Sequence, residues 1–386
     1  MKILQKFILL TIIFFTASQA KAVNIDINIF HNENLKKIEF KVISGKYSLE
    51  GDNIKIADIS KDESYRFRIL GDSIVVEKNA KALGTYKFLK IIGVSFINAF
   101  SFNPLKGNIK IRNYDDNFIL RVKGNSLLAI NSLDLEHYIA GVVQSESGGS
   151  NDDIEYFFVQ AIISRTYALA NYLKHKEDGY NLCDNTHCQY YMGRCRNSDI
   201  ARAVARTGGD VIVDKNNQMI SAAYHSNCGG ETVNSEDIWG IPTTYLKSVR
   251  DTFCNDFGNY NWKFKINTDE FLKYLSFKYH YPITDDIMLN KATHFTQVNR
   301  KANFEFSIPL KNIRADLKLK STFFSIEPQG DMLIFHGKGY GHGVGLCQQG
   351  AINMVRLGYS YQDVIKHYYR DVKIINYTEL KYKFAP

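Results

Sequence analysis

A glycine-rich stretch late in the chain carries side chains that could do chemistry. In residues 336–351, six of sixteen positions are glycine, whereas the whole chain has 26 glycines among 386 residues. Glycine lets the backbone adopt positive φ and pass close to another surface. The same stretch carries four side chains that can form hydrogen bonds, those of His342, Cys347, Gln348 and Gln349. Hydrogen-bonding side chains in such a setting predict a binding site for a polymer or a sugar; the alternative is a structural turn between a strand and a helix.

The strongest candidate for a catalytic acid is Glu146, which we expect in a polar loop over residues 144–150. Partial burial raises the pKa of a carboxyl and lets it donate a proton near neutral pH. The alternatives are an exposed loop glutamate or a cap of the following helix. Arg165 falls inside a mostly apolar predicted helix and needs a partner. That partner could be Glu146, a substrate oxygen or a purely structural carboxylate.

Two histidines stand near glycines in polar segments, His225 and His342. Either could line a site, and either could be a buried, hydrogen-bonded core residue. The sequence contains no G-x-S-x-G, H-E-x-x-H or phosphate-loop pattern. It therefore gives little support to a serine hydrolase, a metalloprotease or a nucleotide-dependent enzyme.

The chain opens with features of a secretory signal peptide. Lys2 and Lys6 precede an apolar run over residues 7–15, and Ala20-Lys21-Ala22 fits a cleavage site. The run is too short to span a bilayer comfortably, and we expect no transmembrane segment in the mature chain. Removing residues 1–22 lowers the formal charge from +8 to +5. Because no Lys/Arg stripe stands out, we expect no nucleic-acid binding. We expect an exported protein of the periplasm or cell envelope.

Six cysteines fit an exported protein, and two interpretations stay open. They are Cys183, Cys188, Cys195, Cys228, Cys254 and Cys347. An even number suggests disulfides. The group Cys183, His187 and Cys188 could instead bind zinc, although its spacing is not that of a regular zinc finger.

Apolar and polar residues alternate with period two through residues 23–130, which predicts a β-rich region of short strands. From residue 131 the pattern changes to a mixed α/β domain that we expect to extend to residue 386. Helices are predicted at 133–141, from Asn151 or Asp152 to about 173, and at 199–207, 348–357 and 361–369. A hairpin is predicted over 211–224, and strands at 108–111 and 304–308. The predicted fold class is therefore α+β.

Several segments together resemble one family, that of stage II sporulation protein D (SpoIID) and LytB. They occur in the order found in that family and cover roughly residues 130–375. Several motifs in order are more specific than one glycine run. The segments are Leu135–Glu146, Gln160–Tyr167, His187–Tyr191, Tyr224–Thr232 and Gly337–Ala351.

The resemblance implies a SpoIID-like catalytic domain with peptidoglycan lytic transglycosylase activity. Such enzymes cut between N-acetylmuramic acid and N-acetylglucosamine, leave a 1,6-anhydro end, and in SpoIID act on strands without peptide stems. The family glutamate maps onto Glu146 as general acid and base, and the family helix arginine onto Arg165. No cofactor is required. The substrate-binding residues implied are Tyr167, Gln189, Tyr190, His225, Ser226, Tyr340, His342, Gln348 and Gln349.

The same resemblance carries alternatives. LytB-type relatives are described as amidase enhancers, so the chain could be a non-catalytic peptidoglycan-binding enhancer of a partner amidase, or an envelope scaffold that docks through residues 23–130. The chain also departs from the family: Tyr340 replaces a usual tryptophan, Cys347 a frequent serine, and Gln349 a frequent aromatic residue. Some members carry zinc near the segment that matches Cys183–Cys188. Here we expect three disulfides, Cys228–Cys254, Cys183–Cys195 and Cys188–Cys347.

Overall fold

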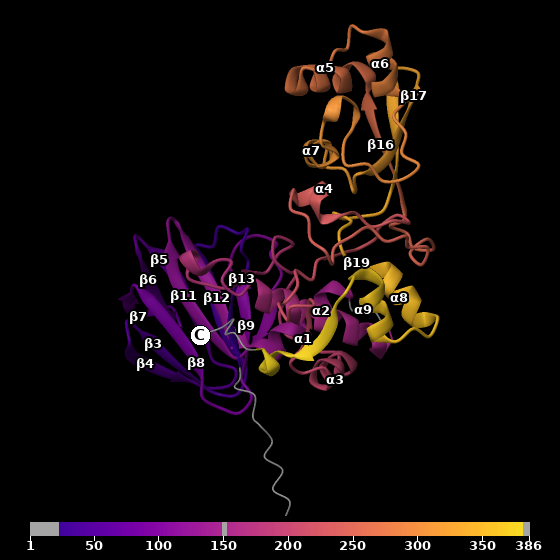
Figure 1. The fold of residues 1–386 in the computed structure, drawn as a ribbon. Coiled ribbons are helices and arrows are strands. Elements are labelled where there is room, and N and C mark those ends of the chain that lie inside the picture. The colour runs from indigo at the N-terminus through magenta and orange to yellow at the C-terminus, as the bar shows by residue number, and fades with distance from the viewer. Residues whose placement is uncertain (1–22, 149–152, 381–386) are drawn as a thin grey trace, which may run out of the picture.

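The computed structural model describes residues 23–148 and 153–380. The predicted signal peptide and the predicted helix start at Asn151 or Asp152 lie outside these residues. The described chain combines many strands with many helices, and its N-terminal part is built of strands (Figure 1). The predicted α+β fold class is therefore confirmed.

Two sheets make up the β-rich region (Figure 1). The first has the order β13 (Leu182–Cys183), β1 (Asn24–Asn28), β12 (Ser126–Asp134), β11 (Asn117–Lys123), β8 (Phe88–Gly93), β3 (Tyr47–Gly51) and β4 (Ile54–Ile59). The second has the order β10 (Arg112–Asp115), β9 (Ala99–Pro104), β2 (Lys37–Ser44), β5 (Ser64–Leu70), β6 (Ser73–Lys78) and β7 (Lys81–Tyr86).

Aromatic rings from the two sheets meet in one core. Phe40 of β2 lies 5.4 Å from Tyr47 of β3, and Phe100 of β9 lies 5.5 Å from Phe118 of β11, between ring centroids. All four are fully buried, as period-two alternation predicts for strands with one face toward a core. The predicted strand at 108–111 is wrong: this segment is irregular, and β10 begins only at Arg112.

Strand β12 runs directly into α1 (Leu135–Glu146), where the Asp134 side chain accepts a hydrogen bond from the Glu136 N–H. The prediction that this helix ends near Gly141 is wrong. Gly141 does not terminate the helix. A Cβ there would lie 2.4 Å from both the Gly193 carbonyl oxygen and the Tyr191 ring, so glycine is needed for close packing. Glu146 is consequently the last residue of a helix and not part of a loop.

The longest helix, α2 (Ile154–Ala170), is buried on nearly all sides. It packs against α1, α3 (Ser198–Arg206), α8 (Gln348–Arg356) and α9 (Tyr361–Tyr368). Two short strand pairs join distant segments: β14 (Asp210–Val213) with β20 (Lys373–Asn376), and β15 (Tyr224–His225) with β19 (Leu346–Cys347). The predicted hairpin over 211–224 is present in part, as a turn closed by an antiparallel bridge between Val213 and Met219, and the longer pairing of β14 is with the C-terminal strand. The short helices α4 (Ser235–Trp239), η1 (Lys176–Asp178) and η3 (Tyr377–Glu379) complete this region.

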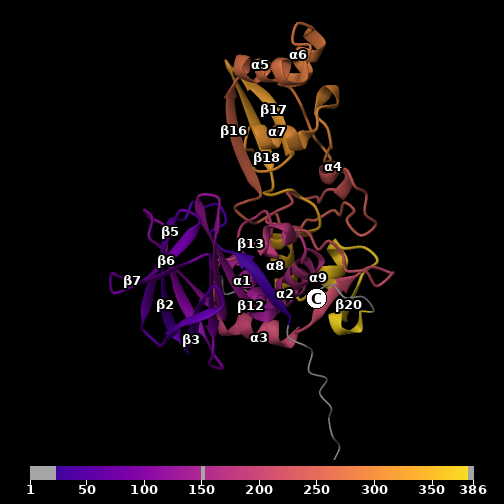
Figure 2. The same cartoon turned by 90° about the vertical axis from the view of Figure 1, so that its left-hand side faces the viewer.

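Residues 261–338 form a separate lobe with its own core, above the rest of the molecule in Figures 1 and 2. Its elements are β16 (Asn261–Asn267), α5 (Thr268–Tyr279), α6 (Asp286–Thr293), η2 (Glu305–Ser307), α7 (Leu310–Asp316), β17 (Phe323–Gln329) and β18 (Met332–Lys338). The predicted strand at 304–308 is instead the turn η2. Asn261 and Lys338 pair directly, so the chain enters and leaves the lobe at neighbouring points. Within residues 23–148 and 153–380, no helix has the length and apolarity that crossing a membrane requires.

Candidate active site

The carboxylate of Glu146 is held by donors from three distant segments. Its Oε1 accepts hydrogen bonds from the Tyr190 backbone N–H and the Tyr224 hydroxyl, both at 3.0 Å. Its Oε2 accepts one from Gln348 Nε2 at 3.4 Å. Tyr224 comes from β15 and Gln348 from the first turn of α8, directly after β19. The parallel pairing of β15 with β19 therefore places both donors on the same carboxylate.

The surroundings of Glu146 favour its protonated form. Burial raises the pKa of Glu146, and the three hydrogen bonds lower it only in part. Among the described residues, no Lys, Arg or His forms an ion pair with this carboxylate. Because Oε2 has fewer donors than Oε1, it is the oxygen better placed to carry the proton. The side chain remains partly exposed, as a proton donor to a substrate must be.

Buried side chains fix the groups that touch Glu146. Gln189 Nε2 donates to the Tyr224 hydroxyl at 3.2 Å, and Gln189 Oε1 accepts from the Tyr138 hydroxyl at 3.3 Å. Gln348 Nε2 also donates to Gln160 Oε1 at 3.3 Å. Sequence reasoning predicted Gln189 and Gln348 but missed Tyr138, Tyr224 and Gln160. The available signal for Gln160 was an amide within an otherwise apolar, buried helix.

Arg165 pairs with Glu136 and not with Glu146, so its predicted catalytic role stays a prediction. Its guanidinium makes a two-pronged ion pair with Glu136, Nε to Oε1 at 2.8 Å and Nη2 to Oε2 at 2.6 Å. Nη1 donates to the Asp210 carbonyl at 3.1 Å, and the side chain has no exposed surface. Arg165 thereby links α2 to α1 and β14. This is the structural role that the sequence offered as an alternative.

The glycine-rich stretch lies along the segment that contains β15. Isolated bridges pair Tyr340 with Asn227 and Val344 with Val233, and both lie after β15 and before β19 in the chain. Gly345 has φ +71°, and a Cβ there would meet the Ala223 carbonyl oxygen at 2.2 Å. The predicted close approach of glycine backbone to another surface is therefore confirmed.

His225 and His342 lie next to each other but not against Glu146. Their ring centroids are 5.5 Å apart, and the His342 ring lies 5.4 Å from that of Trp239. His225 Nδ1 is 3.2 Å from the Val344 carbonyl oxygen, and the residue is buried. Desolvation lowers the pKa of both rings, that of His342 to about 4, so both are neutral near pH 7.

Among the remaining predicted binding residues, some are exposed aromatic rings, and others are polar groups that already form hydrogen bonds within the protein. Tyr190 and Tyr340 are 39% and 45% exposed, and Trp239, which sequence reasoning did not select for binding, is 44% exposed. Gln349 Oε1 accepts from Asn227 Nδ2 at 2.7 Å, and Ser226 Oγ accepts from Asn259 Nδ2 at 3.3 Å. Tyr167 is placed elsewhere, near Cys183 and Cys188; burial raises its pKa, and the two cysteines add to this shift.

All six cysteines are free thiols in this structure, and the expected disulfides are not formed. Five of them fall into two clusters. The first cluster consists of His175, Cys183, His187 and Cys188, and the second of Cys228, Asp251, Cys254 and Cys347. Cys195 is outside both and contacts the Asn197 carbonyl oxygen. Cys183–Cys195 and Cys188–Cys347 therefore pair residues that the fold places in different surroundings.

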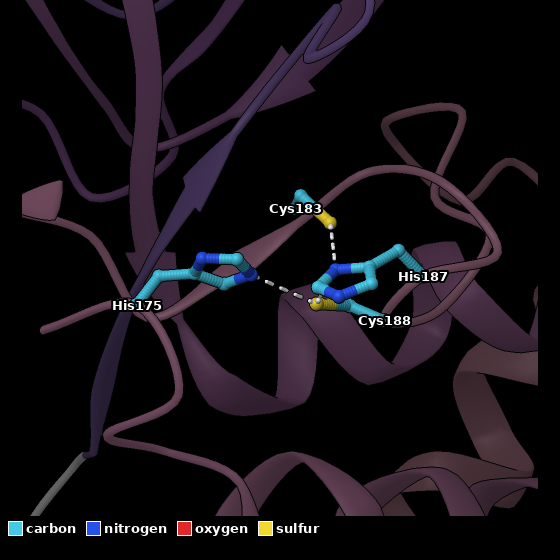
Figure 3. Close-up of side chains that lie close together, drawn as sticks. All are labelled: His175, Cys183, His187 and Cys188. Atoms are coloured by element: carbon cyan, nitrogen blue, oxygen red, sulfur yellow. Dashed lines mark hydrogen bonds between the residues drawn. The ribbon is translucent and has the colours of Figure 1, made fainter.

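The donor set of the first cluster fits a zinc ion (Figure 3). Cys183 Sγ lies 3.6 Å from His187 Nδ1, and Cys188 Sγ lies 3.5 Å from His175 Nε2. Two thiols and two imidazoles are a four-coordinate zinc set. Cys183, His187 and Cys188 were the sequence-based alternative; His175 was missed because no fixed spacing links it to the other three.

The chain is similar to known proteins along most of its length. A family model described as SpoIID, stage II sporulation protein, matches residues 123–213. An uncharacterized protein of Brachyspira hyodysenteriae is 27% identical over 92% of this chain and 97% of its own length. Stage II sporulation protein D of Bacillus subtilis is 28% identical over 64% of this chain and 76% of its own length. A protein named amidase enhancer, also of Bacillus subtilis, is 24% identical over 62% of this chain and 40% of its own length.

Residues 123–213 therefore match the SpoIID family model, and the chain is similar to relatives named stage II sporulation protein D and amidase enhancer, as the order of its motifs indicated. The matched residues 123–213 include Glu146, the Arg165–Glu136 pair and the first thiol cluster. Tyr224 and Gln348, which complete the hydrogen bonding of Glu146, lie beyond that match.

Proposed function

We propose that this protein is a peptidoglycan lytic transglycosylase that cleaves the bond between N-acetylmuramic acid and N-acetylglucosamine in glycan strands without peptide stems. The observation that carries the proposal is the Glu146 carboxyl, partly exposed and held only by neutral donors. Burial raises its pKa, which keeps the carboxyl protonated closer to neutral pH than an exposed glutamate. The protein acts after export, in the periplasm or cell envelope, on glycan strands as its partner.

One carboxyl is sufficient for this reaction. Glu146 protonates the leaving glycosidic oxygen while the sugar's own C6 hydroxyl attacks the anomeric carbon. The resulting carboxylate accepts the C6 hydroxyl proton, so Glu146 ends protonated and a 1,6-anhydro ring closes. Ordinary glycosidases need a second carboxylate for a nucleophile or for water activation. Among the described residues, no second carboxylate contributes to the pKa of Glu146, which agrees with the one-carboxyl route.

Groups suited to binding sugars lie next to Glu146 and along the glycine-rich stretch. Tyr190, Trp239 and Tyr340 expose aromatic faces on which a sugar ring can stack. Gln348 and Gln349 carry amides suited to hydroxyl and acetamide groups, although each already has a protein partner. His225 and His342 support the glycine-rich stretch and take no part in proton transfer.

The test is digestion of purified, peptide-free glycan by the protein alone, followed by mass spectrometry of the products. Fragments with 1,6-anhydro ends are expected without any added amidase. The second candidate function holds under two conditions: the protein alone leaves this glycan intact, and the protein increases the rate at which a co-purified amidase cleaves peptidoglycan. That candidate is an amidase enhancer, and it is favoured by the relative of that name.

Replacing Tyr224 by Phe tests the electrostatics of the site. The Tyr224 hydroxyl donates to Glu146 and lowers its pKa, so removing the hydroxyl should raise the pKa further. A general acid works in its protonated form, and activity is lost as the pH rises through its pKa. The alkaline limb of the pH–rate profile should therefore move to higher pH in this variant. An unmoved alkaline limb would show that another group controls it. Tyr86→Phe in β7 is the matched control.

We also propose that His175, Cys183, His187 and Cys188 hold a zinc ion that fixes the loop before Gln189 and Tyr190. Cys188 immediately precedes Gln189, so a bound ion would restrain the segment whose backbone donates to Glu146. Replacing both Cys183 and Cys188 by Ser is expected to remove one zinc ion per chain, measured by elemental analysis. Cys195→Ser should leave the zinc content unchanged. Equal zinc in the double variant and the wild type would contradict the assignment.

A further inference from the structure

A second group of metal-ligating side chains lies deep in the molecule, separate from the first cluster. It consists of Cys228, Asp251, Cys254 and Cys347, each with 0% exposure or nearly so. The four donor atoms all lie within 4.8 Å of one another. Cys228 follows β15, Cys347 ends β19 as the N-cap of α8, and the other two come from one turn. Three separate segments thus converge on one point.

The distances within this group suit ligands of one ion. Cys228 Sγ lies 3.4 Å from Cys254 Sγ and 3.2 Å from Asp251 Oδ2. Four donors around zinc, with sulfur at about 2.3 Å, lie roughly 3.5–3.8 Å from one another in a tetrahedron. Asp251 and Cys254 are separated by two residues, which is the short spacing of paired zinc ligands. Small shifts would bring all four donors onto a common centre.

The sulfur atoms are surrounded by backbone donors. Cys347 Sγ accepts hydrogen bonds from the Cys228 N–H at 3.3 Å and from the Gly350 N–H at 3.4 Å. The backbone of Gly229 and Gly230 donates to Cys254. A neutral thiol is a weak acceptor, whereas a thiolate accepts such bonds well. Four N–H groups directed at two sulfurs therefore form an environment built for thiolates.

The carboxylate in the group, that of Asp251, is held by a hydroxyl, a backbone N–H and a thiol. Asp251 is fully buried, and its partners are the Tyr368 hydroxyl at 2.9 Å, the Phe253 N–H at 2.9 Å and the Cys228 thiol. Among the described residues it forms no ion pair with Lys, Arg or His. A buried carboxylate surrounded by thiols is costly unless a positive charge compensates it. A divalent ion would supply that charge, and Tyr368 would orient the ligand from behind, as outer partners of metal ligands do.

We propose that Cys228, Asp251, Cys254 and Cys347 form a second, closed zinc site with a structural role. The rival is a Cys228–Cys254 disulfide, which would leave the third thiol and the carboxylate without a function. Binding displaces the thiol protons and leaves four protein ligands with no open position, so the ion takes no part in bond cleavage. Cys347 directly precedes Gln348, and Cys228 follows Tyr224 by four residues. The ion would therefore clamp together the two segments that hold Glu146.

Zinc counting in the full exported chain tests this site, independently of any glycan cleavage. The wild type and Cys195→Ser should each contain two zinc ions per chain, and the Cys183→Ser/Cys188→Ser variant should keep one. Cys228→Ser/Cys254→Ser should lose one, or fail to fold. The decisive sample is the variant that lacks the thiols of the first cluster, because any zinc that it retains must bind elsewhere.

Peptide mapping of the wild-type chain under non-reducing conditions gives a second measurement that needs no variant. Alkylation in denaturant with a chelator should label Cys228, Cys254 and Cys347 as free thiols. A Cys228–Cys254 disulfide in the purified protein would overturn the proposal. So would a Cys183→Ser/Cys188→Ser chain that folds and holds no zinc.

Discussion

Replacing Glu146 by Gln is expected to lower the rate of glycan cleavage on the order of 10²–10⁴-fold or more, the usual contribution of a general acid or base. The loss should be near the upper end, because one residue performs both proton transfers in the proposed reaction. Glutamine keeps the shape of the side chain and can retain part of its hydrogen bonding to Tyr190 and Tyr224. The measurement is the release of 1,6-anhydro ends from peptide-free glycan, together with thermal unfolding.

The matched control for this change is Glu270→Gln, an exposed glutamate in the first turn of α5 in the lobe. It alters charge by the same amount without touching the site. Both variants should unfold near the wild-type temperature, and only Glu146→Gln should lose activity. Wild-type cleavage by a folded Glu146→Gln protein would remove Glu146 from the mechanism.

Replacing Arg165 by Ala is expected to affect stability instead of chemistry. The change leaves Glu136 without its partner and the Asp210 carbonyl without its donor, and it empties a fully buried volume. Breaking a buried ion pair costs about 3–5 kcal/mol, and we expect about 3 kcal/mol because Glu136 is 33% exposed. Urea unfolding of the two proteins measures the difference.

Arg202→Ala is the comparison for this variant. Arg202 pairs with Asp199 on the surface of α3 and is 63% exposed. Exposed pairs contribute about 0–1 kcal/mol, so its loss should be small. Cleavage by the Arg165→Ala protein, measured well below its unfolding temperature, should remain. If Arg165→Ala abolished cleavage without lowering stability, the catalytic role expected from the sequence would be restored.

Local patterns in the sequence predicted the elements well where burial follows a simple period. Within the predicted β-rich region, buried and less buried residues alternate along β2, β5 and β11, because each has one face toward the aromatic core. Gly141 was misleading because glycine ends helices and also permits close packing inside them, and only the position of Tyr191 decides between the two.

The candidate site was only partly predictable, for physical reasons. Glu146 could be selected, but its partners lie 44, 78 and 202 residues away, and no spacing rule connects such distances. Arg165 required a buried partner, yet local sequence could not choose between Glu136 and Glu146. The number of cysteines is even, but the sequence does not show which of them are neighbours in space. Their division into two clusters depends on the β15–β19 pairing and on the loop that carries His175.

The direct pairing of Asn261 with Lys338 has a consequence for how the molecule can diversify. A segment whose two ends are already neighbours can lengthen or shorten at little cost, since each doubling of a loop costs only about 0.6 kcal/mol in closure entropy. The lobe over residues 261–338 has its own core and returns the chain to the point where it left. The region that holds Glu146 can therefore stay the same while the lobe changes in length and sequence.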